Sequence, residues 1–274
     1  MLKKLLTQSF LQRAISGIVL VVIIAFMLIT GGNVLLAFLG AVSIIGVREL
    51  YRIWNIDKSP LGIIGYLGVA VYYVMLYFEL TDYWLMLVLF MLVAVMATYV
   101  FAFPKYKADA VMVVIFGFFY VAVMLSCVYR IRQLNDGIYL VWMVFLCSWI
   151  SDTCAYLVGV TMGKHKFVPN LSPKKTIEGV IGGIAGSVLL GAVYGLILKN
   201  YTTAFDNPVP VCMLIGGIGS VVSMIGDLAA SAIKRNYDIK DYGRLIPGHG
   251  GILDRFDSVI FVAPIIYYLC DFIM

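Results

Sequence analysis

Charged residues are scarce in this chain: Asp, Glu, Lys and Arg make up 13% of its 274 residues, whereas hydrophobic residues make up 62%. A typical soluble domain has about a quarter of its residues charged and just under half apolar. The chain also has no long polar segment from which a soluble domain could be built. The composition therefore argues against a soluble protein and predicts a single integral membrane domain over residues 1–274.

Metal-binding patterns of cysteine and histidine are missing as well. The chain has 5 cysteines and 2 histidines. The cysteines lie in apolar stretches, without a C-x-x-C pair and without a histidine at ligand spacing, so we interpret them as small buried hydrophobic side chains. An inverted internal repeat, which many transporters carry, is not evident. These absences argue against a zinc site, a disulfide framework and a repeat-built transporter.

Long apolar runs, in contrast, recur along the whole chain. A helix needs roughly 20 apolar residues to cross about 30 Å of hydrocarbon. The runs predict an all-α fold, a polytopic bundle of about nine transmembrane helices at residues 14–31, 33–47, 61–78, 84–103, 110–129, 138–160, 178–198, 209–233 and 257–273. The second run is short, so a re-entrant or tilted segment is the alternative there.

Basic residues predict the orientation of these spans. If the N-terminus lies in the cytoplasm, all of the 20 lysines and arginines except Arg130, Arg132 and Lys199 fall on the inner side. Cytoplasmic loops carry such an excess of positive charge. We therefore expect a multi-pass protein of the cell membrane with a cytoplasmic N-terminus.

The densest polar stretch of the chain runs from Ser231 to Asp257, between the last two predicted spans, and it should face the cytoplasm. Its glycine-rich part includes Gly250 and Gly251, whose backbone N–H groups could point at phosphate oxygens. His249 could donate a hydrogen bond to phosphate or act as an acid. A simple turn without a ligand is the alternative for the glycines alone.

Carboxylates gather around this stretch. Asp254 and Asp257 share a helical face if the last helix begins near Leu253, and such a pair repels unless cations lie between them. Arg255 could stabilise charge on phosphates. Taken alone, the D-x-x-D spacing is more typical of a helix N-terminus. With the glycines and a third carboxylate it indicates one or two Mg²⁺ sites that bind a triphosphate.

The third carboxylate, Asp227, lies inside the eighth predicted span. An ionised carboxylate is costly there, so it should face a polar cavity and have a partner. One helical face carries Asp227 together with Ser220, Ser223, Ser231 and Lys234, at spacings of three and four residues. We interpret Asp227 as a ligand of a hard divalent cation, with a polar contact between helices as the alternative.

A second polar patch joins the sixth and seventh predicted spans. Asp152 shares a helical face with Tyr156 and Gly159. Ser172 followed by Pro173 predicts a helix start, which would put Lys174 and Lys175 in the first turn, beside free N–H groups that suit an anion. The alternative is that these lysines reflect only the positive-inside bias.

The glycine-rich seventh span places small residues at every fourth position, which lets another helix pack closely. These residues are Gly179, Gly183, Ser187, Gly191 and Gly195. The packing could lie inside the active-site bundle or at the interface of a homodimer.

The polar stretch resembles the signature of the phosphatidate cytidylyltransferase family. That signature reads Ser-x-apolar-Lys-Arg, then Lys-Asp, then His-Gly-Gly-apolar-x-Asp-Arg-apolar-Asp. Its fixed positions correspond to Ser231, Lys234, Arg235, Lys240, Asp241, Gly243, Pro247, His249, Gly250, Gly251, Asp254, Arg255 and Asp257. The patch with Asp152 and Ser172-Pro173 is similar to another segment of the same family.

The resemblance implies that CTP and phosphatidate give CDP-diacylglycerol and pyrophosphate, a step of phospholipid biosynthesis, at a site carried by residues 138–274. Asp227, Asp254, Asp257 and Asp152 would bind one or two divalent cations such as Mg²⁺; a second, monovalent ion is an alternative. The phosphates of CTP or of the lipid would be bound by Lys174, Lys175, Lys234, Arg235, Lys240 and Arg255.

Two other functions remain open at this stage. A related membrane kinase would transfer the γ-phosphate of CTP to a polyprenol-type lipid. A cation-coupled transporter could also place Asp152 and Asp227 in the membrane, but it would not depend on CTP. A CDP-alcohol phosphotransferase is disfavoured, because the one Asp-Gly pair, Asp136-Gly137, lacks the rest of the motif of that family. We expect membrane lipid as a partner and no nucleic acid.

Overall fold

The computed structural model describes the backbone of residues 8–248 and 250–274 and the side chains of 15–80, 82–248 and 250–274. The described chain is largely helical, which confirms the all-α prediction. It contains 8 helical spans long and apolar enough to cross a membrane, namely Gly32–Ile53, Pro60–Tyr77, Trp84–Phe101, Ala108–Gln133, Gly137–Met162, Ile177–Leu198, Pro208–Asn236 and Leu253–Ile273. A further apolar helix covers Ile15–Thr30.

The second predicted span is longer in the structure than its apolar run. It forms α3 (Gly32–Ile53), a helix of 22 residues, which exceeds the length needed to cross the hydrocarbon. A short re-entrant segment is therefore not required, because the polar residues at the end of α3 continue the helix beyond the apolar run.

The chain divides into two compact units. The first comprises the residues up to Ser126 together with Asp241–Arg255, and the second comprises Cys127–Lys240 together with Phe256–Met274. The helix α12 (Leu253–Ile273) begins in the first unit and continues in the second.

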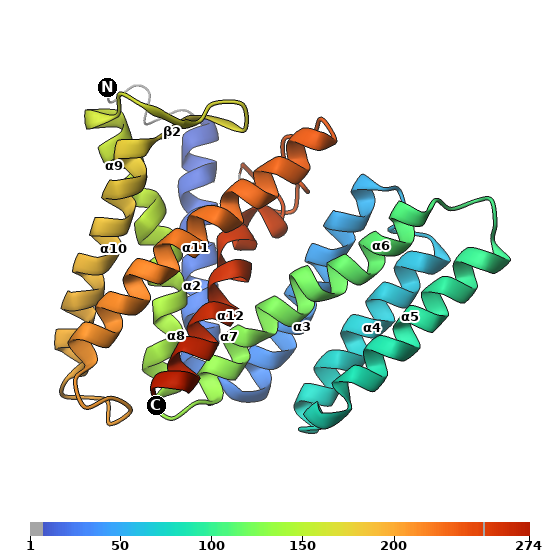
Figure 1. Ribbon diagram of the computed structural model, residues 1–274, viewed down its shortest axis with the longest axis horizontal. Coiled ribbons are helices and arrows are strands. Elements are labelled where there is room, and N and C mark those ends of the chain that lie inside the picture. The colour runs from blue at the N-terminus through green and yellow to red at the C-terminus, as the bar shows by residue number, and fades with distance from the viewer. Residues whose placement is uncertain (1–7, 249) are drawn as a thin grey trace. The chain divides into compact units, whose positions relative to one another are not determined.

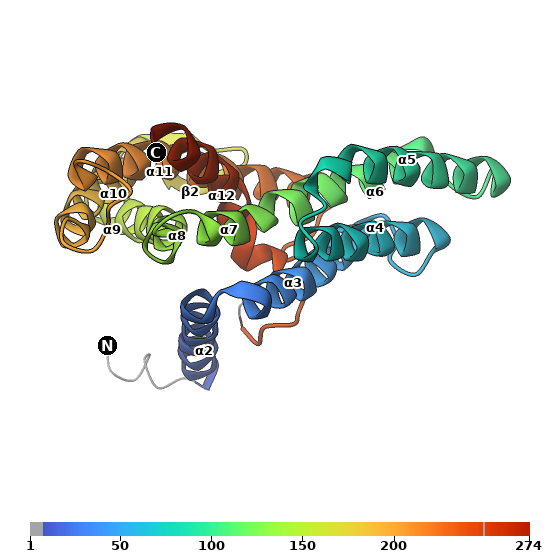
Figure 2. The same cartoon turned by 90° about the horizontal axis from the view of Figure 1, so that it is seen from below.

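In the first unit, α2 (Gln8–Thr30) is followed by the packed helices α3, α4 (Pro60–Tyr77), α5 (Trp84–Phe101) and α6 (Ala108–Gly117), which lie side by side in Figures 1 and 2. A short 3₁₀ turn, η1 (Thr81–Tyr83), precedes α5, and a π-helical turn, η2 (Phe118–Val123), continues α6. The buried Tyr51 hydroxyl donates to the Val114 carbonyl at 2.8 Å, and Ser43 is 2.8 Å from the Tyr73 hydroxyl. These polar contacts join helices whose surfaces are otherwise apolar.

The second unit contains most of α7 (Met124–Gln133), then α8 (Gly137–Phe145), α9 (Ser151–Met162), α10 (Ile177–Leu198), α11 (Pro208–Asn236) and the larger part of α12. Figure 1 shows α9, α10 and α11 side by side. The glycine ladder of α10 makes this packing close: a side chain at Gly183 would meet the Ser151 carbonyl of α9, and one at Gly191 would meet Cys212 of α11. The ladder therefore packs inside the bundle.

A π-helical turn, η3 (Leu146–Ile150), joins α8 to α9 directly before Ser151 and Asp152. Single π-turns inside α-helices occur often at functional sites. Because a π-turn adds a residue to one helical turn, the face of α9 that carries Asp152 is rotated relative to the faces of α8.

A small β-hairpin follows α9 and corrects one prediction. Strand β1 (Lys166–Val168) pairs antiparallel with β2 (Ser172–Thr176), so Lys174 and Lys175 lie in a strand. The prediction that Ser172 begins a helix and puts these lysines in its first turn is wrong. The helix α10 begins at Ile177, because Thr176 is its N-cap and the Thr176 hydroxyl accepts a hydrogen bond from the Gly179 N–H at 3.1 Å.

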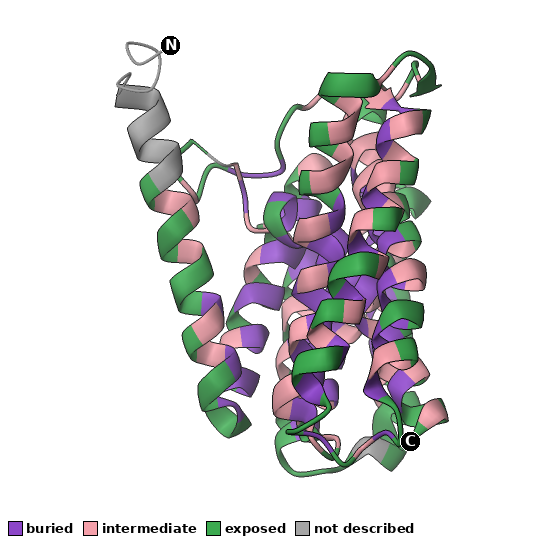
Figure 3. Ribbon diagram, turned by 90° about the vertical axis from the view of Figure 1, so that its left-hand side faces the viewer, coloured by how far each residue is buried: buried purple, intermediate pink, exposed green. Residues whose placement is uncertain are grey.

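Buried residues lie between the packed helices, and exposed residues follow their outward faces (Figure 3). Many of the exposed side chains are large and apolar: Leu189 of α10 is 66% exposed and Phe90 of α5 is 66% exposed. Such surfaces are unfavourable in water but suit a bilayer. The arrangement supports a polytopic membrane protein.

Candidate active site

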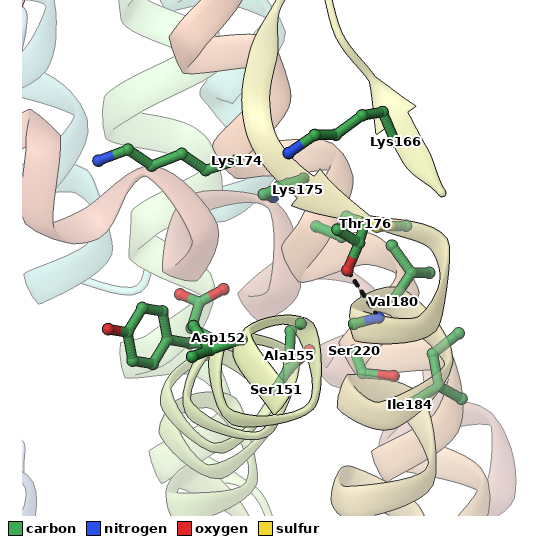
Figure 4. A pocket seen from close by; sticks show the side chains of 15 residues that line it. Ser151, Asp152, Ala155, Lys166, Lys174, Lys175, Thr176, Val180, Ile184 and Ser220 are labelled. Carbon is green, nitrogen blue, oxygen red and sulfur yellow. Dashed lines mark hydrogen bonds between the residues drawn. The ribbon is translucent and has the colours of Figure 1, made fainter. Parts of the chain in front are cut away.

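A pocket of about 400 Å³ opens among α9, β2, α10 and α11 of the second unit. Asp152 approaches it from α9, and Lys174 and Lys175 approach it from β2 (Figure 4). The wall below these charges is mostly apolar. The lining residues are Ser151, Asp152, Ala155, Tyr156, Gly159, Val160, Lys166, Lys174, Lys175, Thr176, Gly179, Val180, Ile184, Ser220 and Met224. The pocket therefore combines lysine side chains with an apolar wall. The helical face predicted to carry Asp152, Tyr156 and Gly159 also lines it.

Asp227 forms an ion pair with Lys175. The Lys175 ammonium nitrogen is 2.6 Å from Asp227 Oδ2, with the side chains 24% and 32% exposed, respectively. The expectation that Asp227 has a partner is thus met by a cation from the hairpin. The lysine thus supplies the opposite charge that a carboxylate in a membrane-spanning helix requires.

Further oxygen atoms lie around this ion pair. Asp257 is close enough to Asp227 and Asp152 for their charges to interact, and Lys234 also acts on it. The buried Ser223 hydroxyl, one helical turn before Asp227, has no hydrogen-bond partner among the described residues. Carboxylate and hydroxyl oxygens suit a hard divalent cation, so the donor chemistry fits Mg²⁺. Within the described residues, however, no three His, Cys, Asp or Glu side chains gather closely enough to hold an ion.

The hairpin that carries the lysines is fixed to the start of α10 by Glu178. The Glu178 carboxylate is 2.6 Å from His165 Nδ1. It also accepts hydrogen bonds from the Lys164 N–H at 3.1 Å and from the His165 N–H at 3.2 Å. His165 is exposed, and its ring nitrogen lies within hydrogen-bonding distance of this carboxylate. The sequence pattern alone assigned no role to Glu178 or Lys166. For Glu178, the available signal was an acidic residue three positions after Lys175.

In the first unit, Asp254 organises the glycine-rich segment between Asp241 and the start of α12, which we call the signature loop. Asp254 Oδ2 accepts hydrogen bonds from the Tyr242 N–H at 2.8 Å and from the Gly251 N–H at 3.0 Å. Gly250 adopts φ +85° with Asp254 directly beside it, a conformation that favours glycine. The Gly251 N–H therefore points at Asp254. The predicted phosphate ligand His249 lies outside the described residues.

The remaining predicted phosphate-binding cations flank the signature loop in the sequence. Lys234 and Arg235 lie in the last turn of α11, where the helix dipole favours positive charge. Arg235, Lys240 and Arg255 are exposed, whereas Asp254 and Asp257 are 8% and 9% exposed, respectively. The helix α12 begins at Leu253 as predicted, so the two carboxylates lie in its first turns.

Fold and site together define a polytopic membrane protein with a lysine-lined pocket. The model of the cytidylyltransferase family matches residues 11–273. The chain is 32% identical to the phosphatidate cytidylyltransferase of Bacillus subtilis (strain 168), over 94% of this chain and 96% of the relative. It is 33% identical to the phosphatidate cytidylyltransferase of Staphylococcus aureus (strain COL), over 94% of this chain and 97% of the relative.

The protein is therefore a membrane nucleotidyltransferase. It belongs to the cytidylyltransferase family, which confirms the resemblance found in the signature stretch.

Proposed function

We propose that this protein transfers the cytidylyl group of CTP to phosphatidate and releases pyrophosphate. The proposal is supported by relatives named for this activity along almost the whole chain. The single structural observation that carries it is the pocket of the second unit, which combines three lysines with an apolar wall. A phosphate on a hydrocarbon-bearing substrate needs both, whereas a soluble nucleotide needs only the charges.

We assign this pocket to phosphatidate. Lys166 and Lys174 would bind the lipid phosphate, while Val180, Ile184 and Met224 would contact the glycerol and the first acyl carbons. Beside the pocket, apolar side chains of α9 and α10 are exposed, as they would be against lipid: Leu157 is 55% and Ile181 is 62% exposed. A lipid could therefore enter the pocket from the bilayer.

In the proposed reaction, a phosphate oxygen of phosphatidate attacks the α-phosphorus of CTP. A new P–O bond forms, the bond to the β-phosphate oxygen breaks, and pyrophosphate leaves with that oxygen. The attacking phosphate is already anionic near neutral pH, so no strong general base is needed. Lys234, Arg235, Lys240 and Arg255 would bind and orient the phosphates of CTP, which supplies catalysis by positioning and by charge stabilisation.

A divalent cation, when bound, would neutralise negative charge on the phosphates. As cation ligands we propose Asp227 and Asp257 with Asp152 within the second unit, and Asp254 within the first unit. The charge interactions of Asp257 with Asp227 and with Asp152 support the assignment in the second unit. The two catalytic cations, Lys234 and Arg255, would stabilise the leaving pyrophosphate.

Pyrophosphate release by purified protein in detergent tests the proposed function. With CTP and Mg²⁺, release should require phosphatidate, and CDP-diacylglycerol should form in equal amount. A lipid kinase would instead produce CDP from CTP with a polyprenol, and a transporter would show no CTP turnover. Either result would overturn the proposal.

We also propose that the signature loop and the N-terminus lie in the cytoplasm, where CTP is. In a variant without native cysteines, Leu245→Cys should react with an impermeant maleimide only in inside-out vesicles, and Tyr201→Cys only in intact cells. Both positions are exposed, 57% and 62% respectively. Labelling of Leu245→Cys in intact cells would contradict the orientation. A homodimer stays a prediction.

A further inference from the structure

Glu49 is a buried carboxylate near the C-terminal end of α3, with 5% of its surface exposed. Its neighbours Val47 and Leu50 are fully buried. An ionised carboxylate in such surroundings is strongly destabilised unless hydrogen bonds or a cation compensate it. Neither the pocket of the second unit nor the proposed reaction uses this residue.

The compensation for Glu49 comes from the signature loop, about two hundred residues further along the chain. Glu49 Oε1 accepts a hydrogen bond from the Ile252 N–H at 3.1 Å, and Oε2 accepts one from the Leu253 N–H at 2.9 Å. Each carboxylate oxygen thus holds one backbone N–H group of the same segment.

These two N–H groups lie at the start of α12, which begins at Leu253. The first N–H groups of a helix have no partner within the helix, and negative charge at this end is favourable. Glu49 therefore acts as a cap that another helix supplies. It fixes the residue at which α12 begins, and Asp254 and Arg255 follow directly.

The loop also closes around the Glu49 side chain. A Cβ atom at Gly243 or at Gly251 would collide with the Glu49 carboxylate. Glycine at both positions is thus explained by the close approach of this side chain. Because Asp254 holds the N–H groups of Tyr242 and Gly251, two carboxylates together hold the described backbone of this loop at Tyr242 and at Gly251, Ile252 and Leu253.

We infer that Glu49 is a positioning residue of the cytidylyl transfer: it sets the conformation of the signature loop, and thereby the placement of Asp254 and Arg255, without contacting the substrates. This inference rests on the proposed function. Misplacement of reacting groups by about 1 Å can cost on the order of a hundredfold in rate, so the loss of a loop clamp should lower turnover more than substrate affinity.

The test compares Glu49→Gln with Ser43→Ala. Glutamine keeps one acceptor but puts an NH₂ group against the second N–H, so one clamp bond is lost. Ser43 lies on α3 like Glu49, and Ser43→Ala removes its buried hydrogen bond to Tyr73 of α4 without touching the loop. We expect kcat to fall about tenfold or more in Glu49→Gln, with KM values for CTP and phosphatidate within about threefold of wild type. Ser43→Ala should lower the unfolding temperature with kcat nearly unchanged. Glu49→Asp, which keeps the charge and both oxygens, should recover part of kcat.

A double variant tests the steric part of the inference. Gly251→Ala should impair kcat through its collision with Glu49, and in a Glu49→Ala background the same change should have little further effect, since coupled residues are non-additive. Fully additive losses would contradict direct contact between the two positions.

Hydrogen exchange separates this inference from the proposed function. The Ile252 and Leu253 amides should lose protection in Glu49→Gln and keep it in Ser43→Ala. If the wild type made no CDP-diacylglycerol, the proposed function would fail, and this measurement would still decide whether Glu49 sets the loop. Unchanged protection of both amides, or a kcat loss no larger than that of Ser43→Ala, would overturn the inference.

Discussion

Carboxylates are stabilised differently in the signature loop and in the pocket of the second unit. At the signature loop, Glu49 of α3 and Asp254 of α12 accept hydrogen bonds from backbone N–H groups. In the second unit, Asp227 pairs with Lys175 and Glu178 pairs with His165. Both arrangements compensate negative charge in a largely apolar protein.

The two arrangements differ in whether the group that stabilises the carboxylate can move. A backbone N–H group cannot move away without rearranging the loop, so the carboxylates of the signature loop define a conformation. A lysine side chain has many rotamers and can exchange one anion for another. The loop therefore provides fixed geometry, whereas the pocket provides charges that can shift from a carboxylate to a substrate phosphate.

The largest effect is expected for Asp254→Asn. An asparagine oxygen can still accept from the Tyr242 and Gly251 N–H groups, so the loop should keep its conformation, but the negative charge proposed to bind a cation is lost. We expect turnover to fall about a hundredfold or more, with an unfolding temperature close to wild type. Pyrophosphate release measures the turnover, and thermal unfolding in detergent measures the unfolding temperature.

Asp57→Asn is the matched control in the same unit. The Asp57 backbone carbonyl accepts from the Tyr66 hydroxyl at 2.8 Å, and this contact survives the substitution. Activity should stay within about twofold of wild type. Near-normal CDP-diacylglycerol formation by Asp254→Asn would rule out its role as a cation ligand and would leave both loop carboxylates structural.

Asp227→Asn should have the next largest effect on activity. It tests the carboxylate that is paired with a movable lysine side chain. Because the ion pair with Lys175 is partly exposed, its loss should cost about 1 kcal/mol or less of the free energy of unfolding. Activity should fall about tenfold or more, and stabilisation by Mg²⁺ and CTP in thermal unfolding should disappear, since only binding to the folded state raises its stability.

The double variant Asp227→Asn/Lys175→Met completes this experiment. If the pair contributes only to the fold, the double variant should be more stable than Asp227→Asn, which leaves the lysine without its partner. A single variant destabilised by about 3–5 kcal/mol but still stabilised by Mg²⁺ and CTP would make Asp227 a structural residue.

Glu178→Gln should have a smaller effect on substrate binding. The substitution weakens the attachment of His165 and Lys164 to α10, so the lysines of the hairpin lose their fixed placement. We expect KM for phosphatidate to rise about threefold to tenfold, with KM for CTP and kcat less affected. Glu79→Gln, on an exposed turn after α4, should change neither. An increase in KM for CTP alone would assign the pocket to the nucleotide.

The helices were predictable from the sequence because the bilayer imposes a simple requirement on length and polarity. The start of α12 near Leu253 was predictable too, since the polar glycine-rich loop ends there. The hairpin at Lys166–Thr176 was not. It is short and contains two prolines, and its attachment depends on Glu178, a contact that no local pattern reveals.

Site residues were predictable where several signals coincided, as around Asp254 and Asp257. Glu49 carries one signal, an acidic residue at the end of an apolar run, and its neighbours Arg48 and Arg52 give it the character of a solvated flank. Only the fold brings it to Ile252 and Leu253. Partners distant in the sequence cannot be inferred from one chain, so the pairing of Lys175 with Asp227 could not be predicted either.

Asp136→Asn should have the smallest effect, on stability alone, and tests whether a carboxylate held by backbone donors also fixes a loop in the second unit. Asp136 Oδ2 accepts from the Thr203 N–H at 2.7 Å, from the Thr202 hydroxyl at 2.8 Å and from the Ala204 N–H at 3.1 Å. The hydrogen bond from the Thr203 N–H, then that from the Thr202 hydroxyl, lowers the pKa of Asp136.

A lowered native pKa contributes stability that is present above the unfolded pKa of about 3.9 and is lost as pH falls through the native value. We therefore expect Asp136→Asn to lower the free energy of unfolding by about 1 kcal/mol at pH 7, with unchanged turnover. The difference from wild type should shrink below about pH 4. Thermal unfolding in detergent across this pH range measures the difference. The control is Asp206→Asn, because Asp206 is exposed in the loop that also contains Thr202 and Thr203. A difference that stayed constant down to acid pH would show that the charge of Asp136 does not hold the loop, and that backbone-held carboxylates fix conformation in the signature loop but not here.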